Sequence, residues 1–193
     1  MWQSHSLLLS TKFQVYRAVV VIALLYGAET WVLYRKQIRL LERFHQRCLR
    51  SILGIKWQNH VSNEEVLKSA SLPSIESILL QVQPRWAGLV TRMEDVRMPK
   101  AVFFSDLQEG KRDRGAQRKR YKKQLKRQLA QAGTSHQSWQ QEASDRDSWH
   151  SSVREASCKF EADRHEAAKE RRRRQKEQAA SQSFSALTCL SKV

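Results

Sequence analysis

Residues 36–53 read KQIRLLERFHQRCLRSIL, and the spacing of their apolar side chains predicts one amphipathic helix. These side chains recur at steps of three and four residues, which is the period of an α-helix. The stripe comprises Ile38, Leu41, His45, Cys48 and Ile52, and Leu40, Phe44 and Leu49 widen it. Four arginines, Arg39, Arg43, Arg47 and Arg50, fall off its centre. Gly54 follows directly, and glycine is a typical helix terminator, so we expect the helix to end there.

The segment before this helix, residues 12–34, predicts a long and buried apolar helix that breaks near Gly27. Its apolar run over residues 18–26 is short, because a membrane span needs roughly twenty apolar residues. Residues 1–5 lack the basic region that opens a secretory signal. We therefore expect no membrane partner and an intracellular protein, either nuclear or cytoplasmic.

The cysteine pattern is consistent with that compartment. Cys48, Cys158 and Cys189 are odd in number and far apart, and no C-x-x-C pair occurs. A disulfide framework is therefore not expected, and a reducing environment is favoured. A tetrahedral zinc site needs four ligands, and no histidine pair has metal-binding spacing. We assign no metal and no cofactor.

Further helix signals follow along the chain. Ser62 and Glu65 have the spacing of a capping box, in which each side chain accepts a hydrogen bond from the other residue's backbone. Residues 73–74, a Pro-Ser pair, open another helix whose apolar positions extend over residues 75–93. Pro84 lies inside this pattern, and we expect a kink or a break there because proline removes a backbone donor.

The remainder of the chain has a weaker apolar pattern. Residues 98–110 read as a connector with a short apolar patch, and Trp139 and Trp149 belong to two short amphipathic segments. Residues 153–178 are helix-prone and highly charged without an apolar stripe, which predicts either a solvated helix or disorder. Residues 179–193 are rich in Ser and Ala and predict a disordered tail.

No useful alternation of apolar and polar residues predicts a strand, so the fold class is all-α. We expect an irregular helical bundle, then a basic helix, then a charged helical or disordered tail. The corresponding regions are residues 1–98, 99–152 and 153–193, the second being a basic connection with short helices.

The net charge of +16 is concentrated in the second part of the chain. Residues 1–110 carry 14 Lys and Arg against 9 Asp and Glu, and residues 111–193 carry 21 against 10. Ten cations fall within residues 111–127, which we call the basic block. They are Lys111, Arg112, Arg114, Arg118, Lys119, Arg120, Lys122, Lys123, Lys126 and Arg127.

Tyr121, Leu125 and Leu129 are spaced four residues apart through this block, which predicts a helix that is basic around most of its circumference and stops at Gly133. Such a helix favours a polyanion partner, RNA or DNA bound through phosphates. A solvated charge run is the alternative, and an anionic membrane surface is disfavoured because the apolar stripe is narrow. Trp86 and Tyr121 could stack on bases, although burial explains Trp86 more simply.

A second cluster of cations comprises Arg171, Arg172, Arg173, Arg174 and Lys176. Such a cluster is typical of a nuclear localisation signal. It equally fits a solvated helix end, because Glu166, Glu170 and Glu177 intervene.

No pattern of catalytic residues is present. Asp95, Asp106, Asp145 and Asp147 are scattered, and no nucleophile elbow or glycine-rich phosphate loop occurs. His45 lies on an apolar stripe, where a satisfied core histidine is the simplest interpretation. We assign no catalytic residue and expect no enzymatic activity.

Several short strings go beyond composition, and their order along the chain is specific. They are Val15–Val19, Leu24–Trp31, Leu41–Arg50, Ile52–Trp57, Asn63–Leu67 with Ala70, Leu72–Ile75, Arg85–Gly88, Val90–Met93, Gly110–Arg112, Arg114–Ala116 and Arg118–Lys122. In this order they resemble the C-terminal region of LINE-type (non-LTR) retrotransposon reverse transcriptases, downstream of the polymerase palm. The resemblance extends from about residue 11 to residue 174.

This resemblance implies a thumb-like helical region over residues 1–98, which in the family grips the template–primer duplex, followed by a nucleic-acid-contacting connection. The catalytic palm of the family precedes the region matched here. The chain departs from the family pattern at Leu89, where a histidine is usual, at Pro84, and at Asp113 and Gln117, which stand in place of prolines. Cys189 lacks the partners of the family's zinc-finger-like module.

These observations favour a non-catalytic, sequence-tolerant RNA- or DNA-binding remnant of such a reverse transcriptase. Two alternatives stay open. One is a helical scaffold that binds protein partners through exposed apolar helix faces. The other is a retroelement relic without a selected function.

Overall fold

The computed structural model describes residues 7–105, 115, 119–131, 133–135 and 138–190, with the backbone alone for residues 180–190. Every regular element in this part of the chain is helical, which confirms the all-α class. The elements are α1 (Leu9–Val15), the π-helical turn η1 (Tyr16–Val21), α2 (Ile22–Leu24), the 3-10 turn η2 (Ala28–Thr30), α3 (Arg35–Leu53), the 3-10 turn η3 (Trp57–Asn59), α4 (Asn63–Ala70), α5 (Ile75–Thr91), α6 (Met98–Phe104), α7 (Tyr121–Gln131), α8 (Trp139–Glu142) and α9 (Arg146–Leu190).

The first apolar segment forms α1, η1 and α2 in succession and ends before Gly27, as expected. Gly27 has a φ of +69°, a conformation that glycine adopts without strain. The expectation of a fully buried helix is wrong, because Val19, Ile22 and Tyr26 are 61%, 63% and 84% exposed. Only one side of the segment packs on the rest of the chain.

Helix α3 occupies nearly the residues expected and ends at Gly54, whose φ is +68°. Its core side includes Ile38, His45, Leu49 and Ile52. Leu40 and Phe44 do not widen that side, contrary to the expectation, since both are substantially exposed. The hydroxyl of Tyr16 lies 2.8 Å from Nδ1 of His45, and burial lowers the pKa of this histidine to about 4.

The predicted capping box is present at the start of α4. The Glu65 N–H donates to Oγ of Ser62 at 3.2 Å, and the Ser62 N–H donates to Oε2 of Glu65 at 2.9 Å. Ser74 caps α5 as expected. The break expected at Pro84 is absent, because α5 continues without interruption to Thr91. The side chains of Leu79, Leu80 and Ala87 are buried on either side of the proline, and their packing outweighs the cost of a proline in a helix interior, about 3 kcal/mol.

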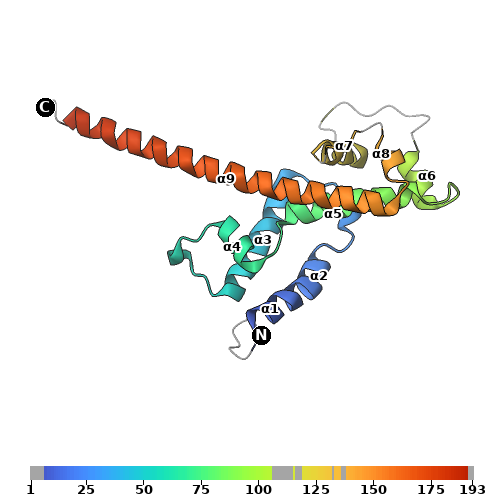
Figure 1. Cartoon of the computed structure of the whole chain (residues 1–193), viewed down its shortest axis with the longest axis horizontal. Coiled ribbons are helices and arrows are strands. Elements are labelled where there is room, and N and C mark those ends of the chain that lie inside the picture. Colours follow the sequence, from blue (N-terminus) through green and yellow to red (C-terminus); the bar gives the residue numbers. More distant parts are fainter. Residues whose placement is uncertain (1–6, 106–114, 116–118, 132, 136–137, 191–193) are drawn as a thin grey trace.

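Helix α5 contributes to two buried clusters. The first gathers α1 to α5 around Tyr16, Leu49, Leu67 and Ile75. The second joins α5 to α7, α8 and α9, and its members are Ala87, Leu125, Leu129, Trp139, Ala143, Trp149 and Val153. Helix α9 packs along α5 and then extends beyond the other helices (Figure 1).

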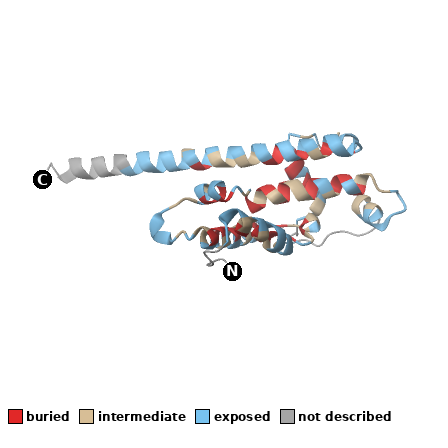
Figure 2. Cartoon of the chain, turned by 60° about the horizontal axis from the view of Figure 1, so that its bottom comes forward, coloured by how far each residue is buried: buried red, intermediate tan, exposed pale blue. Residues whose placement is uncertain are grey.

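Three expectations for the C-terminal half need correction. Residues 98–104 of the expected connector form helix α6. Trp149 belongs to the 45-residue helix α9 and not to a short segment. The same helix includes residues 179–190, where a disordered tail was expected. Figure 2 shows buried and half-buried positions along the N-terminal half of α9, where it lies on α5, and exposed positions further along.

Candidate nucleic-acid interface

The described part of the basic block centres on helix α7, which has two different sides. Leu125 and Leu129 are 3% and 1% exposed and belong to the second core cluster. Four exposed cations, Lys122, Lys123, Lys126 and Arg127, lie away from this buried side, and Nζ of Lys122 donates to the Ser105 carbonyl at 3.4 Å. We call these four residues the α7 cation face. The helix is thus basic on its outer side only, and not around most of its circumference as expected.

Three buried glutamines fix the inner side of α7 in place. Nε2 of Gln124 and Nε2 of Gln128 both donate to Oε1 of Gln83 on α5, at 2.8 and 2.6 Å. Nε2 of Gln83 donates to the carbonyl oxygens of Ala28 and Trp31, at 2.8 and 2.9 Å. These bonds lie away from water and together hold α7 in one orientation, although Oε1 of Gln128 is buried without a hydrogen-bond partner among the described residues.

Backbone contacts of the η2 segment complete this attachment. The Leu33 N–H donates to Oε1 of Gln124 at 2.9 Å, and the Tyr121 hydroxyl donates to the Glu29 carbonyl at 2.8 Å. Burial raises the pKa of the Tyr121 phenol, so the hydroxyl stays a donor. The cation face therefore sits on a helix that is fixed to residues 29–33, about 90 positions earlier in the chain.

Two cations of the block precede the first turn of α7. The ammonium of Lys119 lies 4.7 Å from the ring centre of Tyr34, and the Lys119 N–H donates to the Tyr34 hydroxyl at 3.1 Å. Arg120 is exposed. The helix begins at Tyr121. The other four cations of the block, Lys111, Arg112, Arg114 and Arg118, lie outside the described residues, as do Asp113 and Gln117.

An apolar groove of about 510 Å³ lies beside the start of α7. Its walls come from α5, from α6 and from the beginning of α7. They comprise Trp86, Met98, Pro99, Val102, Phe103, Arg120, Tyr121 and Lys122. Two members of the basic block, Arg120 and Lys122, thus border the apolar surface.

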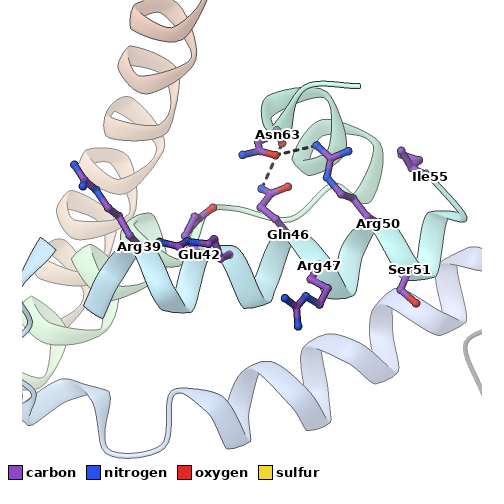
Figure 3. A pocket seen from close by; sticks show the side chains of 9 residues that line it. Arg39, Glu42, Gln46, Arg47, Arg50, Ser51, Ile55 and Asn63 are labelled. Carbon is purple, nitrogen blue, oxygen red and sulfur yellow. Dashed lines mark hydrogen bonds between the residues drawn. The ribbon is translucent and has the colours of Figure 1, made fainter. Parts of the chain in front are cut away.

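A second arginine-lined groove, of about 610 Å³, lies along α3 and was missed by the sequence analysis (Figure 3). Arg39, Arg43 and Arg47 are exposed along it, and each makes no hydrogen bond or ion pair within the described part of the chain. Their spacing of four residues places them about 6 Å apart along the helix. That spacing is visible in the sequence, but there it only marks the side away from the apolar stripe.

Two further residues of this α3 groove, Glu42 and Arg50, hold neighbouring segments in place. Arg50 donates to the Val61 carbonyl at 2.8 Å and to Oδ1 of Asn63 at 2.9 Å. Oε2 of Glu42 accepts the Ile75 N–H at 3.0 Å, and burial raises the pKa of this carboxyl. The start of α3 lies close to α7, because Ile38 lines the same small pocket as Arg127 and Gln128.

The second basic cluster differs from both surfaces because three of its five cations pair with acids. Arg172 pairs with Glu64 of α4, and Arg173 and Arg174 pair with Glu170 at 3.1 and 2.9 Å. Arg173 also lies 3.5 Å from Glu177. These ion pairs reduce the positive charge that the cluster presents to an anionic partner. The sequence alone, with Arg171, Arg172, Arg173, Arg174 and Lys176 close together, indicates a larger charge.

The described residues hold no group of three or more His, Cys, Asp or Glu side chains that could bind a metal ion. None of the described helices is both long enough and apolar enough to cross a membrane. Comparison with known proteins gave no matching family model, no matching curated protein and no matching solved structure.

Proposed function

We propose that the chain binds RNA or DNA through phosphate contacts, without sequence readout and without catalysis. The α7 cation face carries this proposal. Its four cations are exposed on a helix whose inner side is fixed by Leu125, Leu129 and the glutamine network. A fixed row of positive charges favours a polyanion because it releases counterions from the phosphates.

The α3 groove supports the same proposal independently. Three exposed arginines, Arg39, Arg43 and Arg47, follow one line of the helix. Guanidinium groups bind phosphate through two parallel hydrogen bonds, which makes arginine the favoured residue for this contact.

The proposed origin of this binding is the C-terminal region of a LINE-type reverse transcriptase. The ordered strings from residue 15 to residue 122 support it, as does the helical character of the region expected to be thumb-like. In this proposal the chain is a nucleic-acid-binding remnant that does not extend a primer.

The test is the salt dependence of oligonucleotide binding by the full chain. We expect log Kd to rise with log salt, and replacement of Lys123, Lys126 and Arg127 by alanine to reduce the slope by about 2–3. The matched control removes three exposed cations of α9 by changing Arg154, Lys159 and Lys169 to alanine. An unchanged slope in the α7 variant, or equal loss in both variants, contradicts the proposal.

A second candidate function is protein binding through the exposed apolar side of α1 to α3. Leu8, Leu9, Val19 and Ile22 are each at least half exposed, and Leu40 adds a further apolar side chain on α3. Single exposed apolar residues are ordinary, whereas several that form one contiguous surface are typical of an interaction site. Sedimentation of nuclease-treated chain with and without Val19→Ser and Ile22→Ser tests the case in which the partner is a second copy of the chain, and an unchanged sedimentation coefficient contradicts that case.

A further inference from the structure

The apolar groove beside α7 has a composition that phosphate binding alone does not explain. Met98 and Val102 are 74% and 65% exposed, so apolar surface is open to solvent at this place. The groove of about 510 Å³ has the size of a small-ligand site. An open apolar surface of this kind next to cations indicates a ligand with an apolar part and an anionic part.

Aromatic rings form the rear of the groove. The ring centre of Trp86 lies 6.0 Å from that of Phe103 and 5.7 Å from that of Tyr121, with interplanar angles of 74° and 83°. Phe103 and Tyr121 lie 5.9 Å apart. Each ring packs edge-on against the others, which is a favourable geometry that keeps the rings in place. The groove therefore has rigid aromatic walls before any ligand arrives.

The charges lie along one edge of this groove. Arg120 and Lys122 border it, and Lys126 follows Lys122 one helical turn later on α7. A nucleotide presents the complementary pattern, because a flat base is joined through its sugar to a negatively charged phosphate. Stacking of bases on aromatic side chains is the usual complement to a cationic path along a single strand.

We propose that this groove receives one unpaired base of a single-stranded nucleic acid, while the adjoining phosphates lie on Arg120, Lys122 and the α7 cation face. The inference rests on the proposed function and extends it from polyanion binding to a preference for single strands. A base inside a duplex is paired and stacked on both faces, so it cannot enter the groove unless it leaves the helix.

The first experiment uses the unmodified full chain and three fluorescent 12-residue DNA probes. One is an ordinary single strand, the second has the same backbone with abasic positions at its centre, and the third is the duplex. We expect the abasic strand to bind roughly fivefold or more weakly than the ordinary strand, since loss of stacking has this effect in other single-strand sites. We also expect the duplex to bind more weakly than the ordinary strand.

The second experiment assigns this difference to the groove. Met98→Ala with Val102→Ala removes exposed apolar surface from its wall, and Val96→Ala is the control, because Val96 is 94% exposed and does not line the groove. In the groove variant the difference in affinity between the ordinary and abasic strands should shrink at least twofold, whereas the control should behave as the unmodified chain. The salt slope should be the same in all three proteins, because the phosphate contacts are retained.

The outcomes separate the two proposals. Equal binding of ordinary and abasic strands with a normal salt slope overturns the base site and leaves the proposed function standing. Failure of every probe to bind overturns both. A peptide of alternating Asp and Leu is the competing probe. If the groove variant binds this peptide more weakly but keeps the full difference in affinity between the ordinary and abasic strands, the groove is a peptide site and the base proposal is wrong.

Discussion

The indole of Trp149 on α9 lies against the backbone of Gly88 on α5. Its Nε1–H donates to the Pro84 carbonyl at 3.0 Å, one helical turn before Gly88. A Cβ added at Gly88 would lie 2.4 Å from the same nitrogen, which is closer than two such atoms can approach. The absence of a side chain at residue 88 is thus what allows α9 to pack closely on α5.

Gly88→Ala should therefore destabilise the chain. Alanine normally stabilises a helix interior by roughly 0.5–1 kcal/mol relative to glycine. Helix propensity alone therefore predicts a more stable variant, whereas the contact with Trp149 predicts a less stable one. We expect a net loss of about 2 kcal/mol from overpacking, measured by urea unfolding. Leu89→Ala is the control, because Leu89 is 49% exposed on the same helix. A Gly88→Ala variant as stable as the unmodified chain would show that α9 does not pack on α5 as described.

Gln83→Leu should loosen α7 from the rest of the molecule. The substitution leaves the Ala28 and Trp31 carbonyls without Gln83 as a donor and the amides of Gln124 and Gln128 without their shared acceptor. Each buried polar group left unpaired costs about 1–3 kcal/mol. Limited trypsin digestion should cut faster after Lys123 and Lys126 than in the unmodified chain.

Gln81→Leu provides the comparison for this digestion. Gln81 lies on the same helix, is half-buried and makes no side-chain hydrogen bond within the described residues. Its replacement should leave the trypsin rate unchanged. Equal rates for the two leucine variants would mean that the glutamine network does not fix α7.

His45 should make stability depend on pH in a defined range. Its pKa is lowered to about 4 by burial, whereas an unfolded histidine titrates near pH 6.5. The unfolded chain therefore binds a proton that the folded chain does not. The contribution of His45 to the free energy of unfolding is therefore complete above about pH 6.5. It is lost as the pH falls toward 4, and the loss amounts to up to about 3 kcal/mol.

Urea unfolding at a series of pH values checks this prediction against His45→Gln. Glu42 acts in the opposite direction because burial raises the pKa of its carboxyl, and Glu161 and Arg164 of α9 influence His45 with opposite signs. These groups are present in both proteins, so the difference between the two curves reports His45. Parallel curves between pH 4 and 6.5 would show that the histidine is protonated in the folded chain.

Removal of residues 176–193 should leave the core intact. Val153, Ala156, Ser157 and Ala168 are buried, whereas the positions described from residue 171 onward are exposed. We expect the free energy of unfolding to change by less than about 0.5 kcal/mol, as for other surface changes. A chain that ends at residue 152 loses these buried side chains and should unfold without cooperativity. Large destabilisation by the shorter deletion would contradict the packing described for α9.

Local signals in the sequence were sufficient to predict where several helices begin or end. Gly54 ends α3 and Ser62 caps α4 because each acts on its own turn of helix. The uninterrupted helix through Pro84 was not predictable, since the contact with Trp149 comes from 65 residues away. The exposed side of Val19 and Ile22 was also missed, because an apolar residue in a sequence carries no sign of whether a partner covers it.

The candidate site likewise has some features that the sequence predicted and others that it did not. The stripe of Leu125 and Leu129 was predicted from spacing, and both side chains are buried. Gln124 and Gln128 were not expected on that side, because glutamine is ordinarily a surface residue. Their burial depends on Gln83, whose role appears only when α5 and α7 are brought together. The arginines of α3 were visible in the sequence, but the groove between α3 and the segment before α4 was not.

The glutamine network also bears on the order in which the chain can fold during synthesis. The first core cluster joins residues within the stretch 16–79, so it can form once that stretch has emerged from the ribosome. The hydrogen bond between Leu33 and Gln124 spans 91 positions, and the second cluster needs Trp149 and Val153. Contacts between distant residues form late during synthesis, because both partners must first emerge from the ribosome. The nascent chain should therefore acquire its α7 cation face only after a folded N-terminal part is already present to receive it.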